Sequence, residues 1–168
     1  GPTLNQTLDV GAVMQRQINP VELDDIYYLM GKCIWYVQYV EDALHTLLAL
    51  KVEIKVPGAV AEEQANDFLA KHRRSTLGTA LRIAKEHKAL PDPLFNRLTK
   101  LKEERDWLVH RSQNQDGRNL YTDSGRKDVL DRLESLYKET KLLQSEIAEQ
   151  VHTFALSCGI KKEKIEEI

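Results

Sequence analysis

Apolar residues recur at three- and four-residue steps over most of the chain. In the first such segment, from about Val21 to Lys51, they are Ile26, Leu29 or Met30, Cys33, Val37, Val40, Leu44 and Leu47. In the last, from about 126 to 157, they are Val129, Leu133, Leu136, Leu143, Ile147, Val151 and Phe154. This spacing places apolar side chains on one face of an α-helix. The pattern predicts two long amphipathic helices, with Gly159 at the end of the second.

Shorter helices are expected between the two long ones. Pro57-Gly58 separates the first long helix from a helix predicted at 59–73, and Ser75 is a candidate N-cap for a helix at 76–88. Pro91-Asp92-Pro93 is a start signal for a helix running to about residue 112. Its apolar stripe consists of Leu94, Leu98, Leu101 and Leu108. Residues 113–125 have the composition of a loop.

No segment shows the alternation of apolar and polar residues that is typical of a strand. The expected fold is therefore all-α, a helical bundle of four to five helices with two long helices. Residues 1–19 are interpreted as a tag scar (Gly1-Pro2) and a mobile N-terminal arm, because Asn19-Pro20 is a boundary signal. Residues 20–158 form the predicted bundle, and 159–168 a charged tail.

Composition narrows the function classes. With 168 residues, 42% of them hydrophobic and 30% charged, the chain fits one globular domain. A net charge of −2 leaves no global basic field, so a nucleic acid would have to bind a local patch. The most apolar run is short and contains Lys32, which argues against a membrane span. Cys33 and Cys158 are expected to be reduced thiols of a cytoplasmic protein.

One decapeptide carries candidate chemistry: Lys102-Glu-Glu-Arg-Asp-Trp-Leu-Val-His-Arg111. Arg105 precedes His110 by five residues, and an Arg–His pair can stabilise a phosphate and move a proton. The spacing alone is weak evidence, because Arg82 and His87 share it. The contexts differ, since Arg105 is followed by an acidic residue, Asp106.

Helical phase adds to this argument. At about 100° per residue, Arg105 falls on the leucine stripe, either paired with a carboxylate such as Glu41 or Asp42 or used in function. His110 lies about 140° further round, on a face that it shares with Trp107. That face is either an intramolecular packing surface or a subunit interface, where tryptophan is enriched. Asp106, four residues before His110, is placed to orient the ring.

An R-x4-H motif near the end of a late helix, with an acidic residue after the arginine, resembles the HEPN superfamily of toxin and antiphage-defence ribonucleases. Ser75-Thr76-Leu77-Gly78 is also similar to members of this group. The resemblance covers about residues 20–157. It implies a metal-independent endoribonuclease that needs no cofactor and cleaves RNA by 2′-OH attack, at a site built across a homodimer.

Carried over to this chain, Arg105 stabilises the charged phosphorane and His110 acts as general acid or base. Asp106 tunes or orients them, while Glu41 and Arg111 are supporting residues and Trp107 belongs to the dimer interface. Ser112 stands where toxins that pair with a nucleotidyltransferase antitoxin carry a modifiable tyrosine, which puts that regulation in doubt. An antitoxin or another defence protein is a possible partner. The alternative function is a non-catalytic helical dimer module that binds a protein or nucleotide partner.

Overall fold

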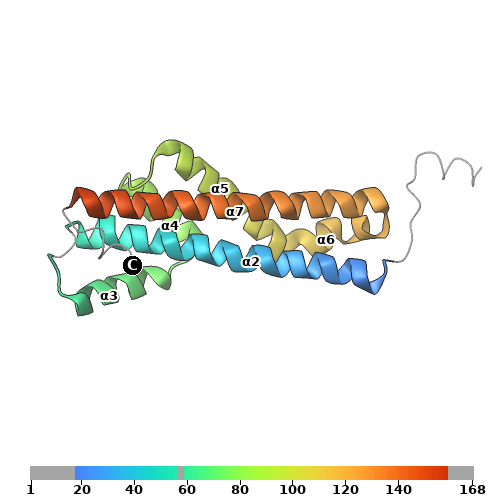
Figure 1. The fold of residues 1–168 in the computed structure, drawn as a ribbon, viewed down its shortest axis with the longest axis horizontal. Helices are drawn as coiled ribbons and strands as arrows, with labels where there is room; N and C mark the ends of the chain where they lie inside the picture. Colours follow the sequence, from blue (N-terminus) through green and yellow to red (C-terminus); the bar gives the residue numbers. More distant parts are fainter. Residues whose placement is uncertain (1–17, 57–58, 159–168) are drawn as a thin grey trace, which may run out of the picture. The chain divides into compact units, whose positions relative to one another are not determined.

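The structure is a computed structural model and describes residues 18–56 and 59–158. Helices and the turns between them make up these residues, and they contain no strand. The elements in chain order are α2 (Pro20–Leu48), η1 (Ala49–Ile54), α3 (Glu62–Arg73), α4 (Leu77–Glu86), α5 (Asp92–Asp106), η2 (Trp107–Arg111), α6 (Ser112–Asp116), η3 (Gly117–Tyr121) and α7 (Asp123–Ser157) (Figure 1). The predicted all-α bundle with two long helices, α2 and α7, is confirmed.

The described chain divides into two compact units, each assembled from distant parts of the sequence. The first combines the residues up to Trp35 with Glu103–Lys138, and the second combines Tyr36–Lys102 with the residues from Glu139 onward. Both long helices contribute one half to each unit. The segment 20–158, predicted as one domain, thus contains two centres of packing.

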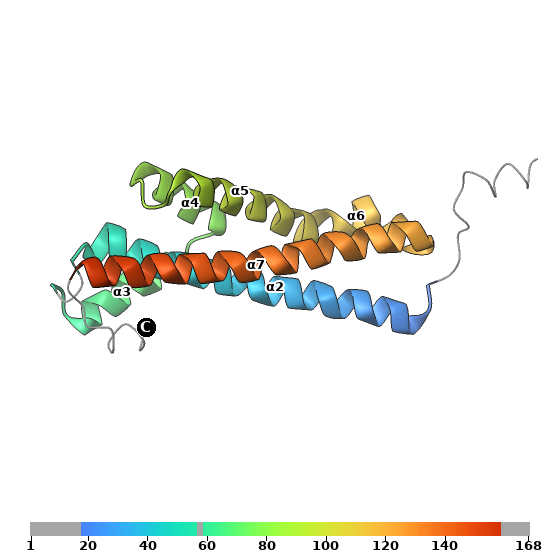
Figure 2. The same ribbon diagram turned by 45° about the horizontal axis from the view of Figure 1, so that its top comes forward.

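In the first unit, α2 and α7 run side by side in the same direction (Figure 2). Arg126 lies 3.9 Å from Glu22 near the start of both helices, and the Cys33 Sγ is 3.2 Å from the Leu133 carbonyl oxygen further along. The buried stripe matches the sequence pattern: Ile26, Cys33, Val129, Leu133 and Leu136. Burial raises the pKa of the Cys33 thiol to about 11, so this cysteine stays protonated and unreactive.

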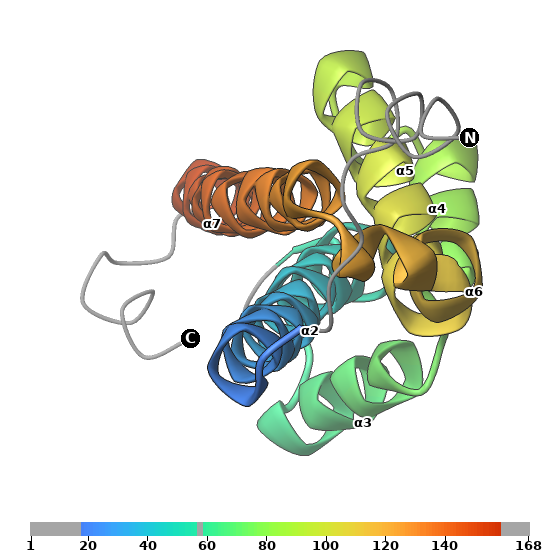
Figure 3. The ribbon, with the colours of Figure 1, turned by 90° about the vertical axis from the view of Figure 1, so that its right-hand side faces the viewer.

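In the second unit, α2 lies between α7 and α3 (Figure 3). The two long helices again bury their apolar stripes: Val37, Val40, Leu44, Leu47, Leu143, Ile147, Val151 and Ala155. Arg97 of α5 binds two carboxylates of α7, with its Nε 2.8 Å from Glu139 and its Nη1 2.6 Å from Glu146. Two charge-assisted hydrogen bonds thus fix the angle between α5 and α7.

Helix ends differ from the sequence expectation at three places. Thr76, rather than Ser75, caps α4, with its Oγ1 accepting from the Thr79 amide at 3.1 Å. The Ser75 hydroxyl instead donates to the His72 carbonyl oxygen at the end of α3. The expected loop at 113–125 contains α6 and η3, and α7 already begins at Asp123. A side chain at Gly125 would collide with the Asn119 carbonyl oxygen, which makes glycine necessary there.

Some predicted features lie outside the described residues: the N-terminal scar and arm up to residue 17, the Pro57-Gly58 break, Gly159 and the charged tail. Within the described residues, no helix combines the length and the apolar character that crossing a bilayer requires.

Two buried histidines join α3 to the end of α2 in the second unit. His45 of α2 is 5% exposed and His72 of α3 is 3% exposed. The His72 Nε2 is 3.3 Å from Glu53 of η1, which also accepts a 2.8 Å hydrogen bond from Lys71. Burial lowers the pKa of His45; the nearby Asp42 opposes this shift, whereas His72 and Arg73 add to it. His45 is therefore neutral in the folded protein at pH values where an exposed histidine is charged.

This burial predicts acid sensitivity. Because the pKa of His45 lies below its ordinary 6.5, the unfolded chain binds more protons than the folded chain as the pH falls below 6.5. The contribution of neutral His45 to stability is complete above that pH and is lost as the pH falls through the lowered pKa. Urea unfolding at several pH values should show a weaker loss in His45→Gln than in the parent. His152→Gln, which alters an exposed histidine of α7, should unfold like the parent at every pH.

Candidate functional site

The Arg–His motif spans the junction between an α-helix and a π-turn. α5 ends at Asp106, and the next five residues form the π-helical turn η2, Trp107–Arg111. The amide of Ser112 donates to the carbonyl oxygen of Trp107, five residues earlier. π-turns are rare inside helices and occur frequently at functional sites, because the extra residue disturbs regular packing. The helix predicted to run to about 112 is thus interrupted at the motif itself.

A cluster around Trp107 holds the π-turn against α7. The Trp107 ring is 3% exposed, and its Nε1 donates a 2.6 Å hydrogen bond to Asp116 of α6. The guanidinium of Arg132 from α7 stacks on the ring, 3.7 Å from its centroid. The Arg132 Nε and Nη2 each lie 2.8 Å from a carboxylate oxygen of Glu104 in α5. We call Glu104, Trp107, Asp116 and Arg132 the Trp107 cluster.

The candidate chemical groups lie beside this cluster in the first unit. Arg105, in the last turn of α5, has a side chain 38% exposed, and its Nη1 lies 3.8 Å from the Asp106 carboxylate. Val109, His110 and Arg111 follow as three consecutive exposed residues of η2. Two guanidinium groups and one imidazole therefore reach the surface within seven residues. Phosphate oxygens suit such donors, since guanidinium forks bind them bidentately.

The π-turn changes the angular relations on which the sequence argument rests. In an α-helix a residue lies above the fourth residue before it, whereas in a π-turn it lies above the fifth. The angle of about 140° between Arg105 and His110 assumes a regular helix over the whole interval, whereas the residues from Trp107 onward belong to the π-turn.

The expected contact between Asp106 and His110 assumes a four-residue step that the π-turn does not keep. The fifth residue after Asp106 is Arg111, not His110. Among the described residues His110 forms no hydrogen bond or ion pair, so Asp106 does not orient its ring within this chain. The expectation of Asp106 as the orienting residue for His110 is corrected; its carboxylate lies near Arg105 instead.

A further predicted site residue, Trp107, is buried rather than exposed. Trp107 was expected at a dimer interface, but at 3% exposure its ring packs inside its own unit and offers almost no surface to a second subunit. The intramolecular alternative for that face is the one observed. Glu41 lies in α2, within the second unit, and its supporting role stays a prediction. Asp42, the other suggested partner of Arg105, forms an ion pair with Arg73 at 2.7 Å.

Sequence reasoning missed the residues that position the motif: Glu104, Asp116 and Arg132. Their signal in the sequence is faint, because Glu104 and Arg132 are single charged residues in charge-rich helices and Asp116 lies at the end of a short polar segment. Asp116 and Arg132 lie 9 and 25 residues from Trp107, so neither shares a local spacing pattern with it. The one available hint was Trp107 itself, since a large ring in a polar segment requires a partner for its N–H when buried.

The described residues contain no group of three or more His, Cys, Asp or Glu side chains arranged to hold a metal ion. The charged residues from Arg105 to Arg111 are two arginines, Arg105 and Arg111, and one acidic residue, Asp106. Such a surface can bind an anion and exchange a proton through His110, whose ring faces solvent. The chain matches no known family model, no curated protein and no solved structure.

The Trp107 cluster generates a stability prediction. Replacing Arg132 by Ala removes a bidentate ion pair with Glu104 and the stacked cation on Trp107, and leaves Asp116 with one cation fewer. The partly exposed pair and the cation–π contact together contribute about 1–2 kcal/mol. Chemical denaturation followed by circular dichroism should show this loss in the free energy of unfolding.

A matched control lies on the same helix. Lys127→Ala removes the exposed pair between Lys127 and Asp131 and should leave the denaturation midpoint unchanged within error. Equal midpoints for Arg132→Ala and Lys127→Ala would show that the Trp107 cluster adds nothing to stability.

Proposed function

We propose that this chain is a metal-independent endoribonuclease of the HEPN type, a toxin or phage-defence effector acting on RNA in the cytoplasm. The observation that supports the proposal is the exposure of His110 on the π-turn η2, with a partly exposed Arg105 in the last turn of α5, immediately before that turn. Arg82 and His87 have the same spacing and are exposed too, but they lie on a regular α-helix and its C-cap, without a π-turn. Arg82 pairs with Glu86 at 2.9 Å, and His87 follows the regular helix α4 as its C-cap.

The proposed reaction uses the substrate's own ribose as nucleophile. His110 accepts the proton of a 2′-OH, the 2′ oxygen attacks the adjacent phosphorus, and the bond from phosphorus to the 5′ oxygen breaks. In a homodimer, His110 of the second subunit donates a proton to the departing 5′ oxygen. Arg105 and Arg111 neutralise the charge that grows on the phosphoryl oxygens. The products are a 2′,3′-cyclic phosphate and a 5′-hydroxyl, and DNA lacks the required nucleophile.

A specific observation favours the alternative, a non-catalytic helical dimer module that binds a protein or nucleotide partner. In this single chain no side chain of the described residues fixes the His110 ring, and a general base usually requires a partner that orients it. In the endoribonuclease proposal, this orientation comes from the substrate or from a second subunit. An antitoxin or another defence protein would inhibit the endoribonuclease, whereas for the non-catalytic dimer module it would be the binding partner.

Replacing His110 by Ala should abolish RNA cleavage while leaving the fold intact. The side chain is exposed and lacks hydrogen bonds to the described residues, so its loss costs little stability. Loss of a general acid–base lowers the rate by about a hundred- to ten-thousand-fold. Single-turnover cleavage of a fluorescent RNA measures the rate, and circular dichroism verifies folding.

His87→Ala is the matched control, because His87 is also exposed and follows an arginine at the same distance. It should cleave RNA at the parent rate. Arg105→Lys keeps one positive charge but loses the guanidinium fork, and should cleave more slowly than the parent and faster than Arg105→Ala. Parent-like cleavage by His110→Ala would refute the proposed mechanism.

Cleavage should continue in EDTA and should yield 2′,3′-cyclic phosphate ends, since the fixed cations Arg105 and Arg111 replace a metal in this mechanism. Mass spectrometry of the products identifies the end groups. A DNA oligonucleotide of the same sequence should remain intact, as should an RNA with a 2′-O-methyl group at the cleaved nucleotide. Two results contradict this prediction: activity lost in EDTA and restored by Mg²⁺ or Mn²⁺, or cleavage of the DNA.

A further inference from the structure

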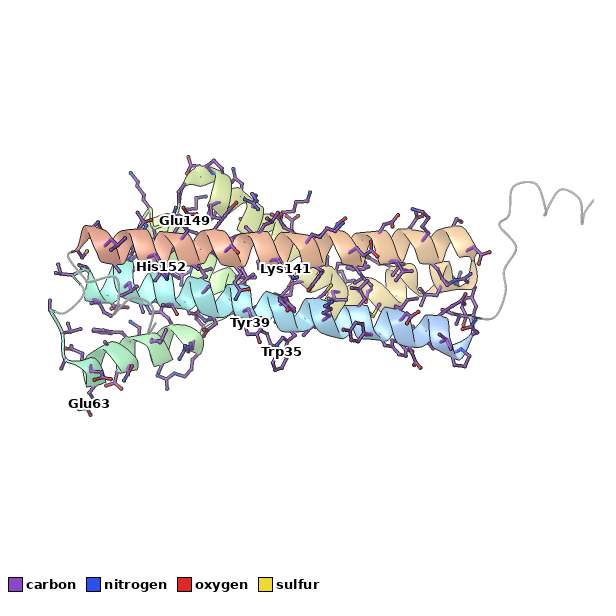
Figure 4. All side chains as sticks on the ribbon, in the orientation of Figure 1. Trp35, Tyr39, Glu63, Lys141, Glu149 and His152 are labelled. Carbon is purple, nitrogen blue, oxygen red and sulfur yellow. The ribbon has the colours of Figure 1, made fainter. Side chains whose placement is uncertain are left out.

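The outer face of α2 in the first unit is apolar and aromatic. Four large side chains on this half of the helix are well exposed: Tyr27 at 57%, Tyr28 at 70%, Ile34 at 39% and Trp35 at 59%. At 100° per residue they fall within a sector of about 120°, opposite to the buried stripe. Trp35 projects from α2 on the side away from α7 (Figure 4). A contiguous apolar patch of this kind marks an interaction surface more often than an ordinary solvated face does.

Gly31 lies in the middle of this face, midway in angle between Ile34 and Tyr28. A Cβ atom at this position would meet nothing within 4 Å, so packing within the chain does not require glycine. Glycine inside a helix lowers helix stability relative to alanine, and a single chain gains nothing in return here. What glycine does permit is close approach of another backbone. Its position therefore points to a second element that crosses α2 at Gly31.

The side chains around Gly31 are arranged symmetrically along the helix. Tyr28 and Ile34 lie three residues before and after it, and Tyr27 and Trp35 lie four residues before and after it. A two-fold axis through Gly31 therefore brings an apolar residue of one copy onto an apolar residue of the other. Such self-complementarity is the requirement for a symmetric dimer interface.

Charge excludes a polyanion as the occupant. Lys32, at the border of the face, lies over the rings of Tyr28 and Tyr137, with its Nζ 5.6 and 4.3 Å from their centroids. Asp24 and Asp25 are exposed at the N-terminal end of the same helix. An RNA strand stacked on these aromatic rings would place its phosphates near carboxylates, whereas a nucleic-acid surface needs a groove of cations.

We infer that Tyr27, Tyr28, Gly31, Ile34 and Trp35 form a homodimer interface, on which α2 of a second copy lies antiparallel and crosses at Gly31. Trp35 then packs on Tyr27 of the partner subunit, and Ile34 on Tyr28 of the partner subunit. From ordinary side-chain areas the two faces bury on the order of 1,000 Å², the size at which specific interfaces begin. The inference does not depend on the ribonuclease proposal, since association is measured without RNA.

The first test is the mass of the protein in solution. Sedimentation velocity at micromolar concentration should give twice the 19.3 kDa of one chain. Trp35→Glu places a charge in the interface of both subunits and should raise the dissociation constant by on the order of thirtyfold or more. Leu142→Glu is the matched control, because Leu142 is similarly exposed, at 57%, on α7. It should associate like the parent.

Gly31→Leu tests the close approach. Leucine favours the helix more than glycine does, and the site is open in the single chain, so this variant folds. It should nevertheless dissociate into monomers at the concentration where the parent is a dimer. Circular dichroism confirms that the helix content is retained.

Cysteine pairs test the register, in a Cys158→Ser background that removes the half-buried thiol. A mixture of Tyr28→Cys and Ile34→Cys chains should form an intermolecular disulfide under mild oxidation. Neither variant alone should form this disulfide, because in the antiparallel pair the two copies of the same cysteine are displaced by six residues, about 9 Å, along the helix.

Three results would overturn the inference: a monomeric parent, a Trp35→Glu variant that remains a dimer, or absence of the mixed disulfide. If Trp35→Glu keeps the parent mass and loses binding to single-stranded RNA, the face is a nucleic-acid surface and the homodimer assignment is wrong. A dimer that cleaves no RNA would leave this inference intact and refute only the proposed function.

Discussion

The contact on which the candidate site depends is the stacking of Arg132 on Trp107. The guanidinium lies between the indole ring and the Glu104 carboxylate, so one side chain of α7 holds the last turn of α5 and the first residue of the π-turn. The carboxylate of Asp116 in α6 accepts a hydrogen bond from the indole N–H of Trp107. A π-turn has poorer backbone packing than an α-helix and persists where the surrounding side chains require it. The exposed positions of His110 and Arg111 follow from the burial of Trp107 and Leu108 immediately before them.

The helices were predictable because burial on one face imposes a period on the sequence. The stripes of α2, α5 and α7 were assigned from that period alone, and nearly all their apolar members are buried. The ends of the helices were predicted less accurately than their faces. Ser75 and Thr76 are both good N-cap residues, and only the backbone conformation decides which hydroxyl reaches a free amide. The division into two units had no sequence signal, since both units draw on both ends of the chain.

The sequence predicted the candidate residues of the site but not how their side chains are arranged. Assigning faces at 100° per residue assumes a regular α-helix, and the assumption fails at Trp107–Arg111, where the hydrogen bonds skip one residue. The error propagates forward: the expected contact between Asp106 and His110 depends on a four-residue step that the turn does not have. The aromatic face of α2 was visible in the sequence only as apolar residues such as Tyr28 and Trp35 outside the main stripe. Their exposure distinguishes a surface feature from a broad buried stripe.

The π-turn also has a consequence for how the motif can vary in length. A π-turn contains one more residue than the α-helical turn it replaces, so a chain lacking one residue between Arg105 and His110 could form an uninterrupted helix there. In that shorter chain the arginine and histidine would be four residues apart, the spacing at which two residues share one face of a regular helix. What the insertion adds is therefore a local change of phase. Trp107 and Leu108 are buried side by side while the histidine after them remains at the surface. The extra residue thus sets the point along the helix at which buried side chains give way to exposed ones.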